Sequence, residues 1–354
     1  MKRIDRYIMA HVFGLTTLVA LALVSIQTFV AFVSEVDEIG RGNFGYQELF
    51  LYTLWLLPTG LYVMLPIIAM LGTLMGLGTL ASQSELTAMR AAGVSLMRIG
   101  GSTLFAGLFI GLFTLAVGDW LAPLGQYEAD ALKTLARSGV KAGVGGKPVW
   151  VREDNHIFNI RRLLREDRIE AVELYTLNPD LSLASASSIE EGFYQDGHWV
   201  FRGVRKTEFG DGRASVSEQD QQEWTGILSP EVLRLFVLEA DALSMAGLSR
   251  LVAYMSRNNL DSSEYALALA RKAVAPFTVM VMMLLAVPFV MGPLRNTGAG
   301  QRLFIGVLIG LGFYVVNEVC ANSGRLYGWP PLFSAAIPTV AFGMVAAWRL
   351  SRVR

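Results

Sequence analysis

Hydrophobic and charged positions are sharply segregated along the chain. Five runs contain no charged residue, at positions 8–33, 49–84, 99–118, 273–294 and 326–348, and a sixth, 303–323, contains only Glu318. About 20 apolar residues in a helix are needed to cross the ~30 Å hydrocarbon core of a bilayer. The pattern predicts an α-helical membrane protein with six transmembrane helices, three before and three after a polar middle.

Short alternating runs separated by turn residues fill that polar middle. The expected strands lie at 149–152, 156–160, 168–177, 183–194, 198–209 and 213–224. Asn178-Pro179-Asp180 is a strong turn signal, and Asp196-Gly197 is typical of a tight hairpin. Strands with this regular spacing predict an inserted all-β domain, an antiparallel sandwich or jelly roll.

Composition supports this division. Hydrophobic residues make up 53% of the 354, and mean hydropathy is +0.43. Of the 60 charged residues, 41 fall between Asp119 and Lys272, so that stretch belongs in water. We expect spans one to three at 1–122, a polar domain with connecting helices at 123–265, and spans four to six at 266–354.

The orientation follows from the positively charged loops, because cytoplasmic loops collect Lys and Arg. Ten such residues share one side: Lys2, Arg3, Arg6, Arg90, Arg98, Arg295, Arg302, Arg349, Arg352 and Arg354. The opposite short loops hold only Arg41 and Arg325, and Arg271 and Lys272 are an exception at the outer start of the fourth span. Both termini are therefore expected in the cytoplasm and the β domain outside, in the periplasm of a bacterium with two membranes.

No motif supports catalysis. The glycine-rich segment 143–147 lacks the P-loop spacing, and Pro148 follows its lysine. One cysteine, Cys320, and three widely separated histidines make a metal site improbable. We expect a protein that is not an enzyme and holds no metal.

The second loop predicts a short amphipathic helix at about 82–93. Ser82 with Glu85 fits a capping box, and Gly93 fits the position after a helix end. Its apolar face contains Leu86 and Met89. Such a helix either lies on the membrane surface or places this face in a groove of a cytosolic partner, with Glu85 pairing with a basic residue.

Several features near the span ends have both a functional and a structural interpretation. Asp119, Glu318, Arg271 and Lys272 are either functional groups or mutual ion pairs. Lys133, Arg137 and Lys141 beyond the third span are either anion contacts or a solvated face. The spacings Gly72-x-x-x-Gly76 and Gly306-x-x-x-Gly310 permit close helix contact, inside the chain or between subunits.

These motifs, in this order and across essentially the whole chain, resemble the lipopolysaccharide export permease family, the F and G transmembrane subunits of the Lpt transporter. The segments that carry the resemblance are Ile4-Asp5-Arg6-Tyr7-Ile8, Ser82-Gln83-Ser84-Glu85-Leu86, Ala91-Ala92-Gly93, Gly118-Asp119-Trp120-Leu121-Ala122-Pro123, Asp241-Ala242-Leu243-Ser244, Gly292-Pro293-Leu294-Arg295 and Tyr327-Gly328 before Pro330-Pro331. The Gly-Pro-Leu-Arg run favours a G-like over an F-like subunit.

The resemblance implies a bacterial inner-membrane subunit that extracts lipopolysaccharide and passes it to a periplasmic bridge towards the outer membrane. Implied partners are an LptF-like permease, a dimeric cytosolic LptB-like ATPase that binds ATP and magnesium, and a single-span LptC-like protein. No cofactor in this chain and no nucleic acid are expected. The competing hypothesis is a proton-coupled secondary lipid transporter that uses Asp119 and Glu318.

The resemblance also assigns residues. The ATPase-coupling residues would be Ser84, Glu85, Leu86, Met89 and Arg90, and the lipid-phosphate cavity would involve Lys133, Arg137, Arg271, Lys272, Arg302 and Glu318. This chain departs from the family at the first span end and loop. Where related proteins carry lysines, it has Ala31, Asp37 and Glu38.

Overall fold

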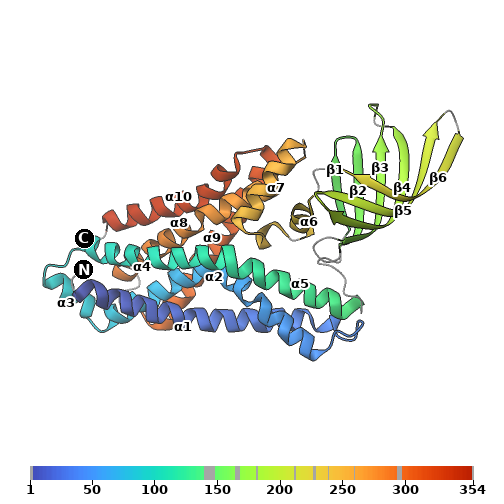
Figure 1. The fold of residues 1–354 in the computed structure, drawn as a ribbon. Coiled ribbons are helices and arrows are strands. Elements are labelled where there is room, and N and C mark those ends of the chain that lie inside the picture. Colours follow the sequence, from blue (N-terminus) through green and yellow to red (C-terminus); the bar gives the residue numbers. More distant parts are fainter. Residues whose placement is uncertain are drawn as a thin grey trace. The chain divides into compact units, whose positions relative to one another are not determined.

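The computed structural model describes residues 3–138, 148–163, 168–180, 182–210, 213–225, 229–237, 239–258, 260–292 and 297–352 (Figure 1). The chain divides into two compact units. The membrane unit comprises Met1–Val33, Leu56–Pro123 and Ser263–Arg354, and the sheet unit comprises Ser34–Trp55 and Leu124–Ser262. The segment Ser34–Trp55, which the sequence suggested was part of the first membrane region, thus groups with the strands.

Long helices account for the membrane unit. They are α1 (Arg3–Ser34), α2 (Tyr46–Ser82), α4 (Leu96–Ala116), α8 (Ser263–Met291), α9 (Ala299–Tyr327) and α10 (Pro331–Arg352), with the short α3 (Glu85–Ala91) between α2 and α4. Within the described residues, six helices are long and apolar enough to cross a membrane. The predicted 3+3 arrangement of spans is confirmed, with the strands between the third and fourth.

The helix of the third span continues past Pro123. A π-helical turn, η2 (Val117–Leu121), joins α4 directly to α5 (Ala122–Ser138), so one continuous helix reaches far beyond the apolar run. Pro123 therefore lies inside a continuous helix, directly after the wider π-helical turn, and has no N–H to donate into it. Helical structure thus extends from Leu96 to Ser138, beyond residue 122 at which the third span was expected to end.

Glycines allow the membrane helices to approach closely. A Cβ at Gly72 would collide with Thr16 of α1, and one at Gly76 would lie 3.0 Å from the Cα atom of Val12. On the other glycine pair, a Cβ at Gly310 would lie 3.0 Å from Ile67 of α2. Both small-residue motifs thus serve packing inside this chain, as the internal interpretation predicted.

The six described strands form one antiparallel sheet in sequential order. They are β1 (Val149–Glu153), β2 (His156–Leu163), β3 (Arg168–Leu177), β4 (Leu183–Gln195), β5 (His198–Gly210) and β6 (Arg213–Trp224). Asp196 and Gly197 both have positive φ, 49° and 87°, as the predicted two-residue hairpin turn requires. The inserted antiparallel domain is confirmed, with the connectivity of a meander.

The sheet curls so that its last strand meets its first two. The Trp224 ring of β6 packs edge-on against Phe158 and His156 of β2, with centroids 5.3 and 4.7 Å apart. Its indole N–H donates to Glu153 of β1 over 3.4 Å. This closure shields one face of the sheet, whose core includes Phe158, Trp199 and Phe201.

Two helices after the strands complete that core. α6 (Pro230–Val237) contributes Leu233 and α7 (Met245–Arg257) contributes Tyr254. The Tyr254 hydroxyl donates to the carbonyl of Arg152 over 3.3 Å. Burial, with a smaller contribution from the Glu153 charge, raises the pKa of Tyr254 to about 12, so this phenol stays neutral at physiological pH.

The first loop of the chain docks on α5 within the sheet unit. The Asn43 N–H donates to the carbonyl of Ala136 over 2.7 Å. The neighbouring Gly42 has φ +63°, and a Cβ there would collide with the Arg137 carbonyl. The loop after the first span is thus fixed against the extension of the third.

Candidate functional site

The turn before α3 differs from the predicted capping box. Ser84, not Ser82, is the N-cap. Its backbone is left-handed (φ 60°), and its side chain forms no capping hydrogen bond. Ser82 instead donates its hydroxyl to the Thr79 carbonyl over 2.9 Å. An N-cap side chain reaches the first turn from an extended backbone, and the tight turn between α2 and α3 does not provide one.

The end of α3 follows the prediction. Gly93 has φ +87°, and its N–H donates to the carbonyl of Arg90 over 3.0 Å. The N–H of Val94 donates to the carbonyl of Met89 over 3.0 Å. These two bonds form a Schellman motif, with the buried Val94 packed in the same cluster as Met89. The helix is therefore short but firmly closed.

The apolar face of α3 is turned into its own chain. Leu86 is 2% exposed and belongs to the core of the membrane unit, together with Leu77 of α2 and Val290 of α8. The expectation that Leu86 sits in a partner's groove does not fit this burial. Leu86 thus packs α3 into the same buried cluster as two of the spans.

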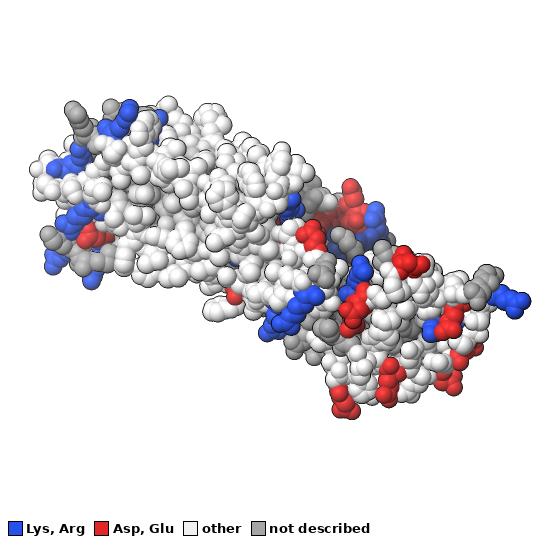
Figure 2. Space-filling model, turned by 90° about the horizontal axis from the view of Figure 1, so that it is seen from above, with Lys and Arg blue, Asp and Glu red and all other residues white. Residues whose placement is uncertain are grey.

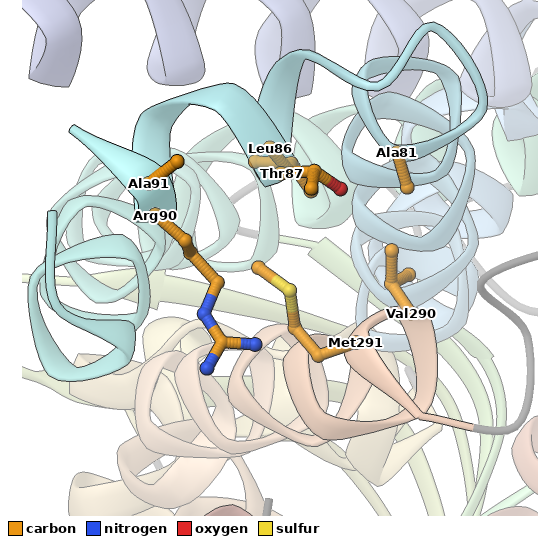
Figure 3. A pocket seen from close by; sticks show the side chains of 7 residues that line it. All are labelled: Ala81, Leu86, Thr87, Arg90, Ala91, Val290 and Met291. Atoms are coloured by element: carbon orange, nitrogen blue, oxygen red, sulfur yellow. The ribbon is translucent and has the colours of Figure 1, made fainter. Parts of the chain in front are cut away.

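The polar side of α3 remains accessible. Glu85 is partly exposed and is hydrogen-bonded by the Tyr7 hydroxyl of α1, while Ser84 and Arg90 are exposed. Beside them lies a pocket of about 290 Å³ lined by Ala81, Leu86, Thr87, Arg90, Ala91, Val290 and Met291. Figure 3 shows Arg90 of α3 and Met291 of α8 pointing toward one another across it.

In the sheet unit, the acidic first loop neutralises the cations beyond the third span. Lys133 Nζ lies 2.6 Å from Glu35, and an Arg137 guanidinium nitrogen lies 3.3 Å from Glu38. Lys133 also lies over the ring of Tyr52, 5.1 Å from its centroid. The departure from the family's basic pattern thus has a structural consequence: both predicted phosphate contacts have a carboxylate partner in this chain.

Arg271 and Glu318 lie together, as the ion-pair interpretation predicted. A guanidinium nitrogen of Arg271 on α8 lies 3.1 Å from the Glu318 carboxylate on α9. Asn322, one turn further along α9, donates its amide to the same carboxylate over 3.3 Å. This arrangement links the fourth and fifth spans, and it occupies the carboxylate that the proton-relay hypothesis requires.

Lys272 makes a different contact from its neighbour. Its ammonium group is buried, lies 5.4 Å from the Tyr62 ring centroid and donates to the carbonyl of Gly118 in the π-helical turn. In that turn the Ala122 N–H reaches back five residues to Val117. The next such bond would join residue 123 to Gly118, but Pro123 has no N–H. Lys272 supplies the missing donor.

Arg302 is enclosed by its own chain. It is 3% exposed at the start of α9, and a Cβ at Gly78 would lie 2.6 Å from its guanidinium. Glycine at 78 makes room for this side chain. A direct contact between Arg302 and a lipid phosphate does not fit such burial.

Some predicted positions lie outside the described residues: Lys141, the glycine-rich segment 143–147 and Pro293-Leu294-Arg295. In the part of the chain that the structure describes, no three His, Cys, Asp or Glu side chains form a group that could hold a metal ion. Glu35 and Tyr7 were missed by sequence reasoning. The acidic loop indicated a partner for Lys133, but no local sequence pattern indicated that Tyr7 contacts Glu85.

An antiparallel sheet inserted between two sets of three spans, with a short closed helix between the second and third, defines a multi-pass membrane protein. Residues 6–352 match the family described as lipopolysaccharide export system permease LptF/LptG. The chain belongs to this family, as the motifs predicted.

Two relatives extend the comparison. The lipopolysaccharide export system permease protein LptG of Escherichia coli (strain K12) is 30% identical over 352 residues, covering 99% of this chain and 98% of that protein. LptG of Haemophilus influenzae is 30% identical over 353 residues, covering 99% of each. Both are G subunits, in agreement with the predicted resemblance. The chain is therefore a lipopolysaccharide export permease of the inner membrane.

Proposed function

We propose that this chain is the permease subunit of an ATP-binding-cassette transporter that extracts lipopolysaccharide from the inner membrane and passes it to a periplasmic bridge. It pairs with an LptF-like subunit, a dimeric LptB-like ATPase that holds ATP and magnesium, and an LptC-like bridge protein. Both termini lie in the cytoplasm and the sheet in the periplasm. The observation that carries the proposal is α3, a closed helix anchored in two spans with its polar side exposed.

In this mechanism α3 receives movement from the ATPase. Glu85 and Arg90 offer charges of both signs to the partner, while Leu86 and Val94 fix the helix in the core of the membrane unit. A displacement of α3 therefore moves α2 and α8 together, because close-packed interiors transmit rather than absorb strain. Ser84 and Met89 act by shaping the turn and the helix end.

The cations beyond the third span meet the lipid phosphates. Lys133 and Arg137 can do so by exchanging Glu35 and Glu38 for phosphate oxygens, since both pairs are partly exposed. Surface ion pairs of this kind are worth only about 0–1 kcal/mol, so exchange is energetically accessible. Arg271, Lys272 and Arg302 support the spans that enclose the lipid.

A charge reversal at α3 tests the coupling. Glu85→Arg should reduce lipid-stimulated ATP hydrolysis and lipid release by at least about tenfold in the purified complex, because it reverses the proposed contact charge. Tyr7→Phe is the matched control: it removes the internal hydrogen bond to Glu85 and keeps the carboxylate, so activity should remain within about twofold.

Two results would count against the proposal. One is an assembled Glu85→Arg complex that hydrolyses ATP and releases lipid as the wild type does. The other is lipid export in proteoliposomes that depends on a proton gradient and not on ATP.

A further inference from the structure

Two arginines at the C-terminal end of α10 lie over aromatic rings. The guanidinium carbon of Arg352 lies 4.4 Å from the Trp348 ring centroid. That of Arg349 lies 5.6 Å from Trp348 and 5.7 Å from Phe289 at the end of α8. Both arginines are exposed. The rings hold the guanidinium groups in place while their hydrogen-bond donors remain directed to the surroundings.

Three other cations of the membrane unit have carboxylate partners. Arg98 is hydrogen-bonded to Asp5 over 3.0 Å, Arg271 to Glu318 over 3.1 Å, and Arg325 lies 3.9 Å from Glu264. Within the residues that the structure describes, Arg349 and Arg352 form no ion pair. Figure 2 shows blue atoms at this end of the membrane unit beside a broad uncharged surface. The two charges are available to an anion.

An apolar stripe leads along α10 to these arginines. Val340, Met344 and Trp348 are 55%, 62% and 50% exposed and are spaced four residues apart, and Arg352 continues the series. Residues at i and i+4 lie on one face of a helix. Along this face, the apolar side chains of Val340 and Met344 are followed by Trp348 and then by the cation Arg352.

We propose that this face binds an anionic phospholipid in the leaflet on the side of the chain termini. Its phosphate accepts hydrogen bonds from Arg349 and Arg352, and one acyl chain lies along Met344 and Val340. Guanidinium groups form paired hydrogen bonds with phosphate, and basic pockets at membrane helices hold anionic headgroups. In the proposed orientation this leaflet is the cytoplasmic one.

The stripe distinguishes a lipid from other anions. A soluble phosphate would use the arginines but gain nothing from exposed Val340 and Met344. An acidic peptide could not contact Val340 and Met344, because these residues lie in the hydrocarbon region of the membrane. A lipid satisfies both the charge and the apolar surface in one molecule.

The test is native mass spectrometry of the full chain with its co-purified partners, titrated with phosphatidylglycerol and with phosphatidylethanolamine of the same acyl chains. The wild type should prefer phosphatidylglycerol by about fivefold or more. The double change R349Q/R352Q should weaken the tightest phosphatidylglycerol binding by about 30-fold, as expected for two interfacial cations. Trp348→Ala should weaken phosphatidylglycerol binding about threefold, because Arg349 and Arg352 lose the indole ring that both contact.

The matched control is R3Q/R6Q. It removes the same charge from the same end of the membrane unit, and neither Arg3 nor Arg6 lies over an aromatic ring among the described residues. Binding within about twofold of wild type supports a specific site. An equal loss in both double variants, no lipid preference, or displacement by water-soluble glycerol phosphate at similar concentration would overturn the proposal.

Discussion

At the scale of the residue, Lys272 occupies the hydrogen-bonding position that Pro123 leaves open. Its ammonium group donates to the Gly118 carbonyl, while the Tyr62 ring lies beside it. A buried carbonyl without a donor costs about 1–3 kcal/mol. The two residues are 149 positions apart in the sequence, so only the tertiary structure reveals that one compensates for the other.

A double-mutant cycle tests this compensation. Lys272→Met should destabilise the purified protein by about 1–3 kcal/mol, because it leaves the Gly118 carbonyl without this donor. Pro123→Ala restores a backbone N–H, so the loss from Lys272→Met should be smaller in that background by at least about 1 kcal/mol. Thermal unfolding in detergent measures all four proteins. Additive effects of the two changes would show that Lys272 and Pro123 are independent.

The candidate cations divide by residue environment. Lys133 and Arg137 are partly exposed in ion pairs, whereas Lys272 and Arg302 are buried in the membrane unit. Residue type and position near a span end predicted one role for all of them. Burial separates cations that can meet a ligand from cations that support the fold.

At the scale of the element, helix contacts depend on where each glycine faces. Gly72 of α2 meets the backbone of Thr16 on α1, whereas nothing lies within 4 Å of a Cβ at Gly312 of α9. Both lie in apolar helices with other glycines nearby, so sequence alone gives them the same interpretation.

The same substitution at these two positions should therefore have opposite effects. Gly72→Ala should destabilise the protein by about 1–3 kcal/mol, since α1 and α2 must separate. Gly312→Ala should be neutral or stabilise it by up to about 1 kcal/mol, because alanine favours helix. Thermal unfolding of the purified chain is the measurement. A stable Gly72→Ala variant would mean that α1 is not packed on α2 as described.

The elements themselves were well predicted where the signal is local. The bounds of β3 and β6 match the expected strands at both ends, and each of the six apolar runs lies largely within one long helix. The continuation of α4 into α5 was missed because a proline after an apolar run normally signals an end. The π-helical turn and the distant Lys272 remove the usual cost of that proline.

At the scale of the whole molecule, orientation rests on the distribution of positive charge. Ten Lys and Arg residues lie in the termini and loops on one side, whereas the short loops on the other side hold two and Arg271 and Lys272 begin the fourth span there. Both chain ends lie at the same end of the membrane unit (Figure 1). The sheet unit should face the periplasm if the charge bias sets the topology.

Single cysteines can test this orientation after Cys320→Ser removes the native thiol. Ser217→Cys in β6 and Ser351→Cys in α10 are both exposed positions. A membrane-impermeant maleimide should label the first in intact spheroplasts and the second only after the membrane is disrupted. Labelling of Ser351→Cys alone in intact spheroplasts would reverse the proposed topology.

Local sequence patterns were enough to predict the six spans, the inserted antiparallel strands, the hairpin at Asp196-Gly197 and the helix end at Gly93. These features depend on local periodicity, on backbone preferences of single residues and on the cost of placing charge in hydrocarbon. The family also followed from short motifs in order along the chain.

The packing of the folded chain established which groups meet although they are far apart in the sequence. It joined Glu35 to Lys133, Arg271 to Glu318 and Lys272 to Gly118, and it turned Leu86 inward. Contacts between residues far apart in sequence are set by the packing of whole helices, which no local pattern encodes. For that reason the sequence identified the candidate residues, while burial and pairing assigned them their roles.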